Sequence, residues 1–215
     1  MSLVRELEAR KVIERRQLFE AITNHLRNLG VDASLVEESS MDNFGGTVRE
    51  PIIELKGRSI DRIRLASTDY LSCGILASVS RFHYEVFLDK KFTRKFSKDI
   101  RAKTKSIKDK KSLGLFGGTV VGINWVGQDL AELLNHDSEI TKVLLDCIKS
   151  TGKPEFQVQT RSTSTVEILG PRFAEPQRIT DLLTLGAKER FEECIFGFKI
   201  CERIARHIRE LASNR

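Results

Sequence analysis

Residues 81–88 read Arg-Phe-His-Tyr-Glu-Val-Phe-Leu, a stretch in which apolar and polar side chains alternate. Successive side chains of an extended chain point to opposite sides, so this alternation separates two faces. One face holds Phe82, Tyr84, Val86 and Leu88, and the other holds Arg81, His83 and Glu85. The pattern predicts a strand over residues 75–88 with one face in the core and the other in water.

The segment that follows alternates in the same way. Phe92, Phe96, Ile100 and Ala102 share one parity, while basic and hydroxyl side chains occupy the other. Residues 89–91 have the composition of a turn. We therefore predict that 75–88 and 92–105 form a long antiparallel hairpin with a wet, basic outer face.

Further elements flank this pair. Helical spacing of apolar residues predicts helices over 3–29, 128–148 and 187–211, and a shorter helix that begins at Pro176. Gly30 stands where a C′ glycine belongs, and Asp137 or Ser138 is the predicted N-cap after a break in the second helix. Strands are predicted over 31–36, 52–55, 60–65, 119–126, 155–160 and 165–169, with loops over 37–47 and 106–118.

Strands that run together, with helices before and after them, favour an α+β fold over a parallel α/β fold. We predict a mostly antiparallel sheet of six to eight strands, helices packed on one face, and long N- and C-terminal helices. A chain of 215 residues suits a single domain over 1–215. The heavily charged helix within 1–30 either projects from that domain or packs on a partner. Homo-oligomerisation through the terminal helices and ordinary packing within one chain both fit.

The sequence lacks any apolar run near the ~18–20 residues of a membrane span, and no signal-peptide core is recognisable. These features favour the cytosol, although a piece of a larger membrane protein would look the same. The four cysteines form no Cys-x-x-Cys pair, and Cys194 and Cys201 are too far apart along one helix for a disulfide. Free, buried thiols are expected.

Positive charge is concentrated in one segment. Residues 90–111 hold eleven basic and two acidic residues, so they carry +9, whereas the whole chain carries +6 and the remainder −3. On a strand, alternate side chains repeat at ~6.6–6.8 Å, close to the ~6–7 Å between phosphates of a nucleic-acid strand. The candidate anion-binding residues are Lys91, Lys95, Arg101, Lys103, Lys105, Lys108, Lys110 and Lys111. The alternative is a solvated sheet face that keeps the protein soluble. The outward parity of this segment carries no Phe, Tyr or Trp on which bases could stack, which counts against single-strand binding.

A loop with apolar residues follows the basic strand. Leu113, Leu115 and Phe116 come directly after Lys108, Lys110 and Lys111, a combination that suits an anionic membrane surface. The same tip would also suit a protein partner, or a small satellite core under the loop. The glycines at 114, 117, 118 and 122 match neither a dinucleotide nor a P-loop fingerprint.

No metal, cofactor or catalytic motif is recognisable, so we expect no cofactor and no metal site. The favoured interpretation is a non-enzymatic binding or regulatory domain. Its basic strand and loop would contact an anionic partner, either a membrane surface or a nucleic acid. The alternative is an enzyme for an anionic small molecule, with its site at the sheet end near Arg161, His83 and the glycines at 114–118.

Overall fold

The computed structural model describes residues 3–41, 47–72, 75–88, 101–108, 120–127, 129–151, 155–162, 164–174 and 185–213. Its helices are α1 (Leu3–Asn28), α3 (Asp129–His136), α4 (Ser138–Thr151) and α6 (Leu185–Ser213). Its strands are β1 (Asp32–Met41), β2 (Thr47–Lys56), β3 (Arg62–Ser72), β4 (Ile75–Phe87), β5 (Ala102–Lys108), β6 (Val120–Gly127), β7 (Gln157–Ser162), β8 (Thr165–Leu169) and β9 (Phe173–Ala174).

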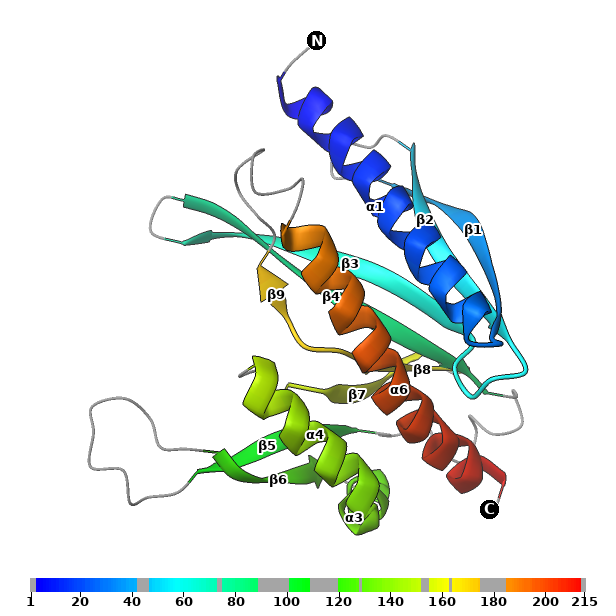
Figure 1. Ribbon diagram of the computed structural model, residues 1–215, viewed down its shortest axis with the longest axis vertical. Helices are drawn as coiled ribbons and strands as arrows, with labels where there is room; N and C mark the ends of the chain where they lie inside the picture. Colours follow the sequence, from blue (N-terminus) through cyan, green and yellow to red (C-terminus); the bar gives the residue numbers. More distant parts are fainter. Residues whose placement is uncertain are drawn as a thin grey trace.

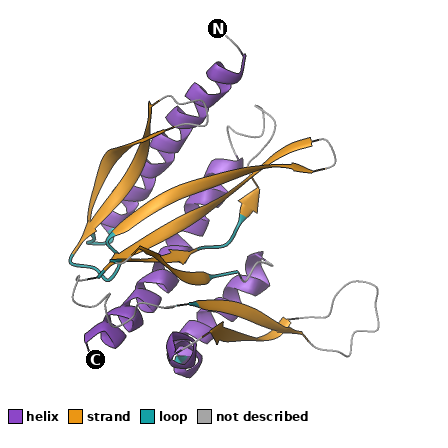
Figure 2. Cartoon of the chain, turned by 180° about the vertical axis from the view of Figure 1, so that it is seen from behind, coloured by secondary structure: helices purple, strands orange, loops and turns teal. Residues whose placement is uncertain are grey.

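Eight strands form one antiparallel sheet in the order β1-β2-β3-β4-β8-β7-β5-β6, and the short β9 pairs with β4. The helices lie in front of the sheet in Figure 1, and the strands come to the front when the molecule is turned by 180° (Figure 2). The predicted α+β class, the antiparallel sheet and the helix layer on one face are confirmed. Within the described ranges, no helix combines the length and the apolar character that a membrane span requires.

The predicted hairpin between 75–88 and 92–105 is wrong. β4 pairs with β3, β8 and β9, whereas the described part of the basic segment, β5, pairs with β6 and β7. The β7–β8 hairpin is thus inserted between β4 and β5. Alternation identifies the face of each side chain but carries no information on which strand lies alongside.

The predicted loop over 37–47 is also partly wrong. Residues 37–41 continue β1, and this part of the strand pairs with residues 47–51 of β2. Residues 42–46 lie outside the described residues. So does the segment in which a helix is predicted to begin at Pro176, as far as Leu185, where α6 begins. The serine-rich composition of residues 39–40 concealed the strand, because the ladder forms through backbone groups and tolerates polar side chains at an exposed edge.

Helix α1 ends as the sequence predicts. Gly30 has φ +74°, its N–H donates to the carbonyl of Arg27, and the N–H of Val31 donates to the carbonyl of Leu26. These two bonds are those of a Schellman motif, which needs a residue in the left-handed region at C′. Leu26 and Val31 are both buried, so the motif carries its usual hydrophobic contact and turns the chain directly into β1.

The terminal helices pack on the sheet and on each other. Phe19 of α1 meets Phe82 of β4 with ring centroids 6.3 Å apart, and His25 of α1 lies edge-on to Phe191 of α6 at 5.3 Å. The buried hydrophobic side chains in the described part of α6 are Cys194, Phe198, Ile200, Cys201, Ile204, Ala205 and Ile208. Cys194 and Cys201 are free, as expected. Oligomerisation through these helices stays a prediction.

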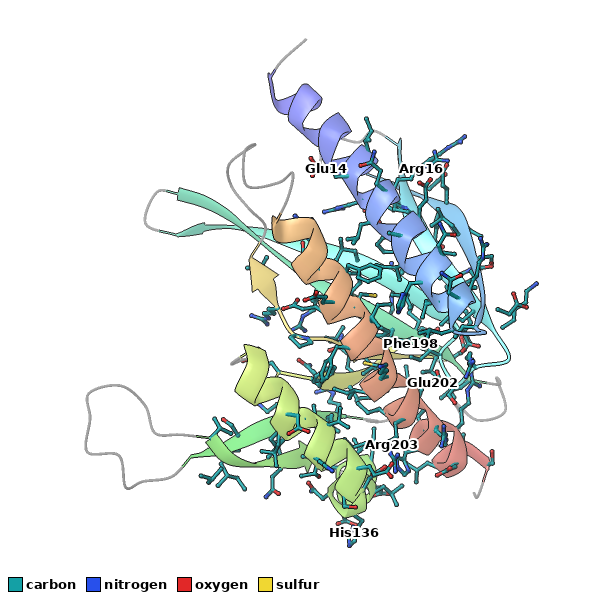
Figure 3. The ribbon with its side chains drawn as sticks, viewed as in Figure 1. Glu14, Arg16, His136, Phe198, Glu202 and Arg203 are labelled. Carbon is teal, nitrogen blue, oxygen red and sulfur yellow. The ribbon has the colours of Figure 1, made fainter. Side chains whose placement is uncertain are left out.

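Polar contacts from two adjacent residues of α6, Glu202 and Arg203, reach two different parts of the fold; both residues are labelled in Figure 3. The Glu202 carboxylate accepts hydrogen bonds from the backbone N–H groups of Ser59 and Ile60, at 2.9 and 3.2 Å, in the turn before β3. On the side of α3 and α4, Arg203 Nε lies 2.6 Å from Asp137 Oδ2. The other oxygen of Asp137, Oδ1, accepts from the N–H groups of Glu139 and Ile140, so Asp137 is the N-cap of α4.

The outer edge of β6 is covered by a side chain. The Asn135 amide accepts from the N–H of Trp125 at 2.8 Å and donates to the carbonyl of the same residue at 2.9 Å. Asn135 therefore takes the place of a neighbouring strand at this point. Such a contact satisfies backbone groups that would otherwise invite edge-to-edge pairing.

The sheet and α6 approach each other closely at Tyr84 and Gly197. Tyr84 is buried, and its hydroxyl donates to the carbonyl of Cys194 at 3.0 Å. A Cβ added at Gly197 would lie 2.5 Å from that hydroxyl oxygen, which is below contact distance. Because the hydroxyl is bonded and enclosed, the tyrosine cannot swing away cheaply.

We expect Gly197→Ala to lower the free energy of unfolding by about 1–3 kcal/mol, because the methyl group overpacks this contact. In a Tyr84→Phe background the nearest atom is Cζ at 3.3 Å, so the same substitution should cost less. Urea unfolding of the four proteins measures this coupling. Lys199→Ala, at an exposed position of the same helix, is the control and should change stability by less than about 0.5 kcal/mol. Equal costs in the two backgrounds would show that Tyr84 does not set the helix position.

Candidate anion-binding site

The sheet face that the helices leave uncovered is turned toward the viewer in Figure 2. Over β3, β4, β7 and β8 this face carries a group of polar side chains. We call this group the carboxylate cluster, and its members are Arg64, His83, Glu85, Gln159, Arg161 and Glu167. The register brings them together, since Glu85 stands opposite Glu167, which in turn stands opposite Gln159.

Glu85 and Glu167 are only 2% and 4% exposed, and like charges directly opposite each other destabilise a sheet. Two arginines offset this repulsion. Arg64 lies 2.8 Å from Glu85 and 3.5 Å from Glu167, and Arg161 contacts Glu85 while lying 3.7 Å from Glu167. Each guanidinium therefore bridges both carboxylates, and the charges of the cluster are matched internally.

Hydrogen bonds complete the surroundings of Glu167. His83 Nδ1 lies 2.7 Å from its Oε1, and the Gln159 amide donates to its Oε2 at 3.1 Å. Burial by itself would raise the pKa of Glu167, but these contacts and the charges of His83 and Arg161 outweigh it and lower the pKa to about 2. The carboxylate is therefore held ionised, and His83 is engaged by it.

Beside the cluster lies a cavity of about 590 Å³, which we call the basic cavity. Four separate segments line it: β4, the β5–β6 hairpin, the residues that lead into β7, and the link between β8 and β9. The lining residues are Arg81, Lys103, Thr104, Lys105, Val126, Glu155, Phe156, Gln157 and Arg172. Lys103 pairs with Gln157 across the β5–β7 ladder, so the cavity opens where β5 leaves β7.

The basic cavity concentrates positive charge. Within the described lining, Arg81, Lys103, Lys105 and Arg172 supply four positive charges against the single carboxylate of Glu155. Among the described residues, none of the four makes an ion pair within 4.0 Å. Burial lowers the pKa of Arg81, and the nearby charge of Arg172 lowers it further. The arrangement thus holds positive charges together in a half-buried recess. A bound anion would reduce the repulsion between them.

The structure locates only part of the basic segment that the sequence singles out. Arg101, Lys103 and Lys105 lie on the exposed parity of their strand segment, and Ala102 is buried, as the alternation predicts. Lys108 ends β5. The candidates outside the described residues are Lys91, Lys95, Lys110, Lys111, Leu113, Leu115 and Phe116. Of the eight basic candidates, Lys103 and Lys105 line the basic cavity.

The site proposed for an enzyme at the sheet end has a different position from the cavity. His83 and Arg161 belong to the carboxylate cluster and do not line the cavity, and the glycines at 114–118 lie outside the described residues. Arg81, Glu155 and Arg172 do line it and were missed as candidates. Arg81 shares the outer parity of His83, which is the one sequence signal that could have suggested it, whereas Arg172 stands in a link with no pattern.

Other ionisable groups serve the fold. Asp137 caps α4 and pairs with Arg203 and His207; burial would raise its pKa, but these contacts lower it to about 2. Burial raises the pKa of the Cys194 thiol to about 12, so this cysteine is not poised as a nucleophile. Within the described part of the chain, no group of three or more His, Cys, Asp and Glu side chains, the carboxylate cluster included, has an arrangement that could hold a metal ion.

Comparison with known proteins returns no match: no family model, no curated protein and no solved structure resembles the chain. The function therefore has to be argued from the side chains themselves.

The pKa of Glu167 makes stability depend on acid. Its folded-state pKa of about 2 lies below the ordinary value of 4.5, so its contribution of roughly 3 kcal/mol is present above about pH 5 and is lost as the pH falls toward 2. We expect Glu167→Gln to lower the free energy of unfolding by about this amount at pH 7 and to flatten the decline between pH 5 and pH 2. Urea unfolding at a series of pH values measures both effects.

Glu54→Gln is the matched control. Glu54 also lies on this sheet and pairs with Arg62 at 2.8 Å, but its side chain is 37% exposed, so the substitution should cost less than about 1 kcal/mol. A Glu167→Gln protein whose stability falls with acid as steeply as that of the parent would show that Glu167 is not the titrating group.

Proposed function

We propose that the protein is a non-enzymatic binding domain that contacts a nucleic acid through strand β5 and the basic cavity. The observation that carries the proposal is the convergence of Arg81, Lys103, Lys105 and Arg172 on one recess with a single opposing carboxylate. A solvated basic face would spread its charges outward, because like charges repel. Three segments that bring cations to one place support a role in holding a partner of opposite charge.

The spacing on β5 favours a phosphate chain over a membrane surface. Lys103 and Lys105 are exposed and lie two residues apart on the strand, so they repeat at ~6.6–6.8 Å, similar to successive phosphates of a nucleic-acid strand. Both lysines also line the basic cavity. A recess suits a phosphate that projects from a chain better than it suits a flat bilayer. The apolar tip that would support membrane binding lies outside the described residues.

The lining indicates that phosphates, and not bases, would be recognised. Among the described residues of the cavity wall, Phe156 is the one aromatic residue, and it is 1% exposed, so its ring is not offered for stacking. Lysine and arginine contacts to phosphate position a nucleic acid without reading its sequence. The expected binding is therefore salt-dependent and largely independent of sequence.

An anionic small molecule is a second candidate, supported by the size of the cavity. Its volume of about 590 Å³ lies within the range of about 300–1,000 Å³ typical of ligand sites. The described lining holds one carboxylate, Glu155, and neither an imidazole nor a thiol. This composition supports binding in preference to proton transfer or nucleophilic attack, which draw on such groups most often.

We expect the double substitution Lys103→Glu and Lys105→Glu to weaken binding to a short duplex at least about tenfold and to reduce the dependence of log affinity on log salt by about two. Each lysine that contacts a phosphate displaces about one counterion, so losing two contacts removes about two from the slope. Fluorescence anisotropy with a labelled duplex, between about 50 mM and about 200 mM salt, provides the measurement.

The matched control is Lys56→Glu with Lys199→Glu, which reverses the same charge at two exposed positions away from the cavity. The control should bind nearly as well as the parent protein. Equal losses in the two variants would mean that only net charge matters. Binding to acidic vesicles in the absence of any binding to nucleic acid would replace the proposed partner with a membrane surface.

A further inference from the structure

The arginines of the uncovered sheet face divide into two groups. Three of them pair with carboxylates: Arg62 with Glu54 at 2.8 Å, and Arg64 and Arg161 with Glu85 and Glu167. Arg81 and Arg172 form no ion pair within the described residues, although Arg81 lies close enough to Arg172 for their charges to interact. The arginines of the carboxylate cluster are thus neutralised by its carboxylates. The positive charge that remains for a ligand on this part of the described surface is concentrated at the basic cavity.

The two unpaired guanidiniums approach the cavity from different segments. Arg81 belongs to β4 and is half-buried, and Arg172 stands in the link between β8 and β9 and is exposed. Lys103 and Lys105 approach from β5. A group that enters this recess would therefore be met by cations from three segments. Arginine offers a planar fork of N–H donors that suits an oxyanion with several equivalent oxygens.

We propose that the basic cavity holds a phosphomonoester group, with Arg81 and Arg172 as its guanidinium ligands and Lys103 and Lys105 as further cations. The inference rests on the proposed function and names the part of the nucleic acid that enters the recess, which is a terminal phosphate. Lys103 and Lys105 lie at the exposed wall of the cavity, so in this proposal they contact both the terminal phosphate and the internal phosphate next to it.

Charge and shape both favour a monoester over an internal diester. A phosphomonoester carries a charge of about −1.5 to −2 near neutral pH and presents three acceptor oxygens. A diester carries one negative charge and presents two unesterified acceptor oxygens. Four cations against Glu155 leave an excess of three positive charges, which the monoester offsets better. A terminal group also has a single covalent attachment, so it can enter a recess without leading a second chain out of it.

The test compares oligonucleotides of identical sequence that carry a phosphate at the 5′ end, at the 3′ end or at neither end. We expect the parent protein to bind at least one phosphorylated form about tenfold more tightly than the unphosphorylated form, as two charge-assisted contacts allow. Arg172→Gln should reduce this preference to near one while leaving binding of the unphosphorylated form within about twofold. Arg172 is exposed, so the variant should fold.

Two further variants sharpen the test. Glu155→Gln removes the carboxylate that opposes the four cations. It should tighten binding of the phosphorylated form about threefold, because a negative charge that repels the phosphate is lost. Arg206→Gln removes an exposed arginine of α6, outside the cavity lining, and should leave the preference unchanged. An equal loss of preference in Arg206→Gln and Arg172→Gln would overturn the assignment of the cavity.

Competition with a nucleoside monophosphate and with inorganic phosphate distinguishes the source of the phosphate and separates the two proposals. Equal binding of all three oligonucleotides by the parent protein would overturn this inference and leave the proposed function standing. Binding of the monophosphate that depends on Arg172, without any binding of nucleic acid, would support the inference and overturn the proposed function in favour of a small-molecule site. No binding of any probe at low salt would overturn both.

Discussion

The contact between Tyr84 and helix α6 sets the separation between the two layers of the molecule. The Tyr84 ring stands in the core, its hydroxyl is bonded to the carbonyl of Cys194, and a glycine at position 197 leaves room for it. From this point the helix reaches the turn before β3 through Glu202 and the cap of α4 through Arg203. One helix therefore connects the central strand β4 with the turn before β3 and with the cap of α4.

The uncovered face has a constraint of its own. Glu85 and Glu167 lie opposite each other in a ladder that β4 and β8 form, and both are removed from water. Their repulsion is tolerable only because Arg64 and Arg161 each bridge the pair. Burying charges rarely adds net stability compared with an apolar core, although losing one partner of such a group is costly. The cluster therefore fixes the register and the arginine positions more than it adds free energy of folding.

The cluster and the basic cavity together form one electrostatic surface with two parts. In the first part every carboxylate has a cation, and in the second part cations outnumber carboxylates by four to one. Arg81 links the two parts. It lies two residues before His83 on β4, on the same face of the sheet, and its charge interacts with those of Glu167 and Arg172. This division supports a surface on which one region is structural and the neighbouring region receives a ligand.

The sequence by itself determined the α+β class, the antiparallel sheet, the C′ glycine at the end of α1, an N-cap at Asp137 or Ser138, and the buried thiols of α6. These features depend on local patterns: alternation, helical spacing, and the preference of Gly30 and Asp137 for special backbone positions. It also identified Lys103 and Lys105 as exposed cations, because parity places them opposite the buried Ala102.

Only the tertiary structure decided which strands are neighbours, and with them the site. Antiparallel ladders are held by backbone groups that every residue has, so nothing in the side chains of 75–88 announces that β8, and not the basic segment, lies alongside. Arg81 and Arg172 are ninety-one positions apart in the chain and meet at one cavity because β8, β7 and β9 return to β4 and β5. A group of charges assembled from four segments leaves no local trace in the sequence, since its members are neighbours only after the sheet has formed.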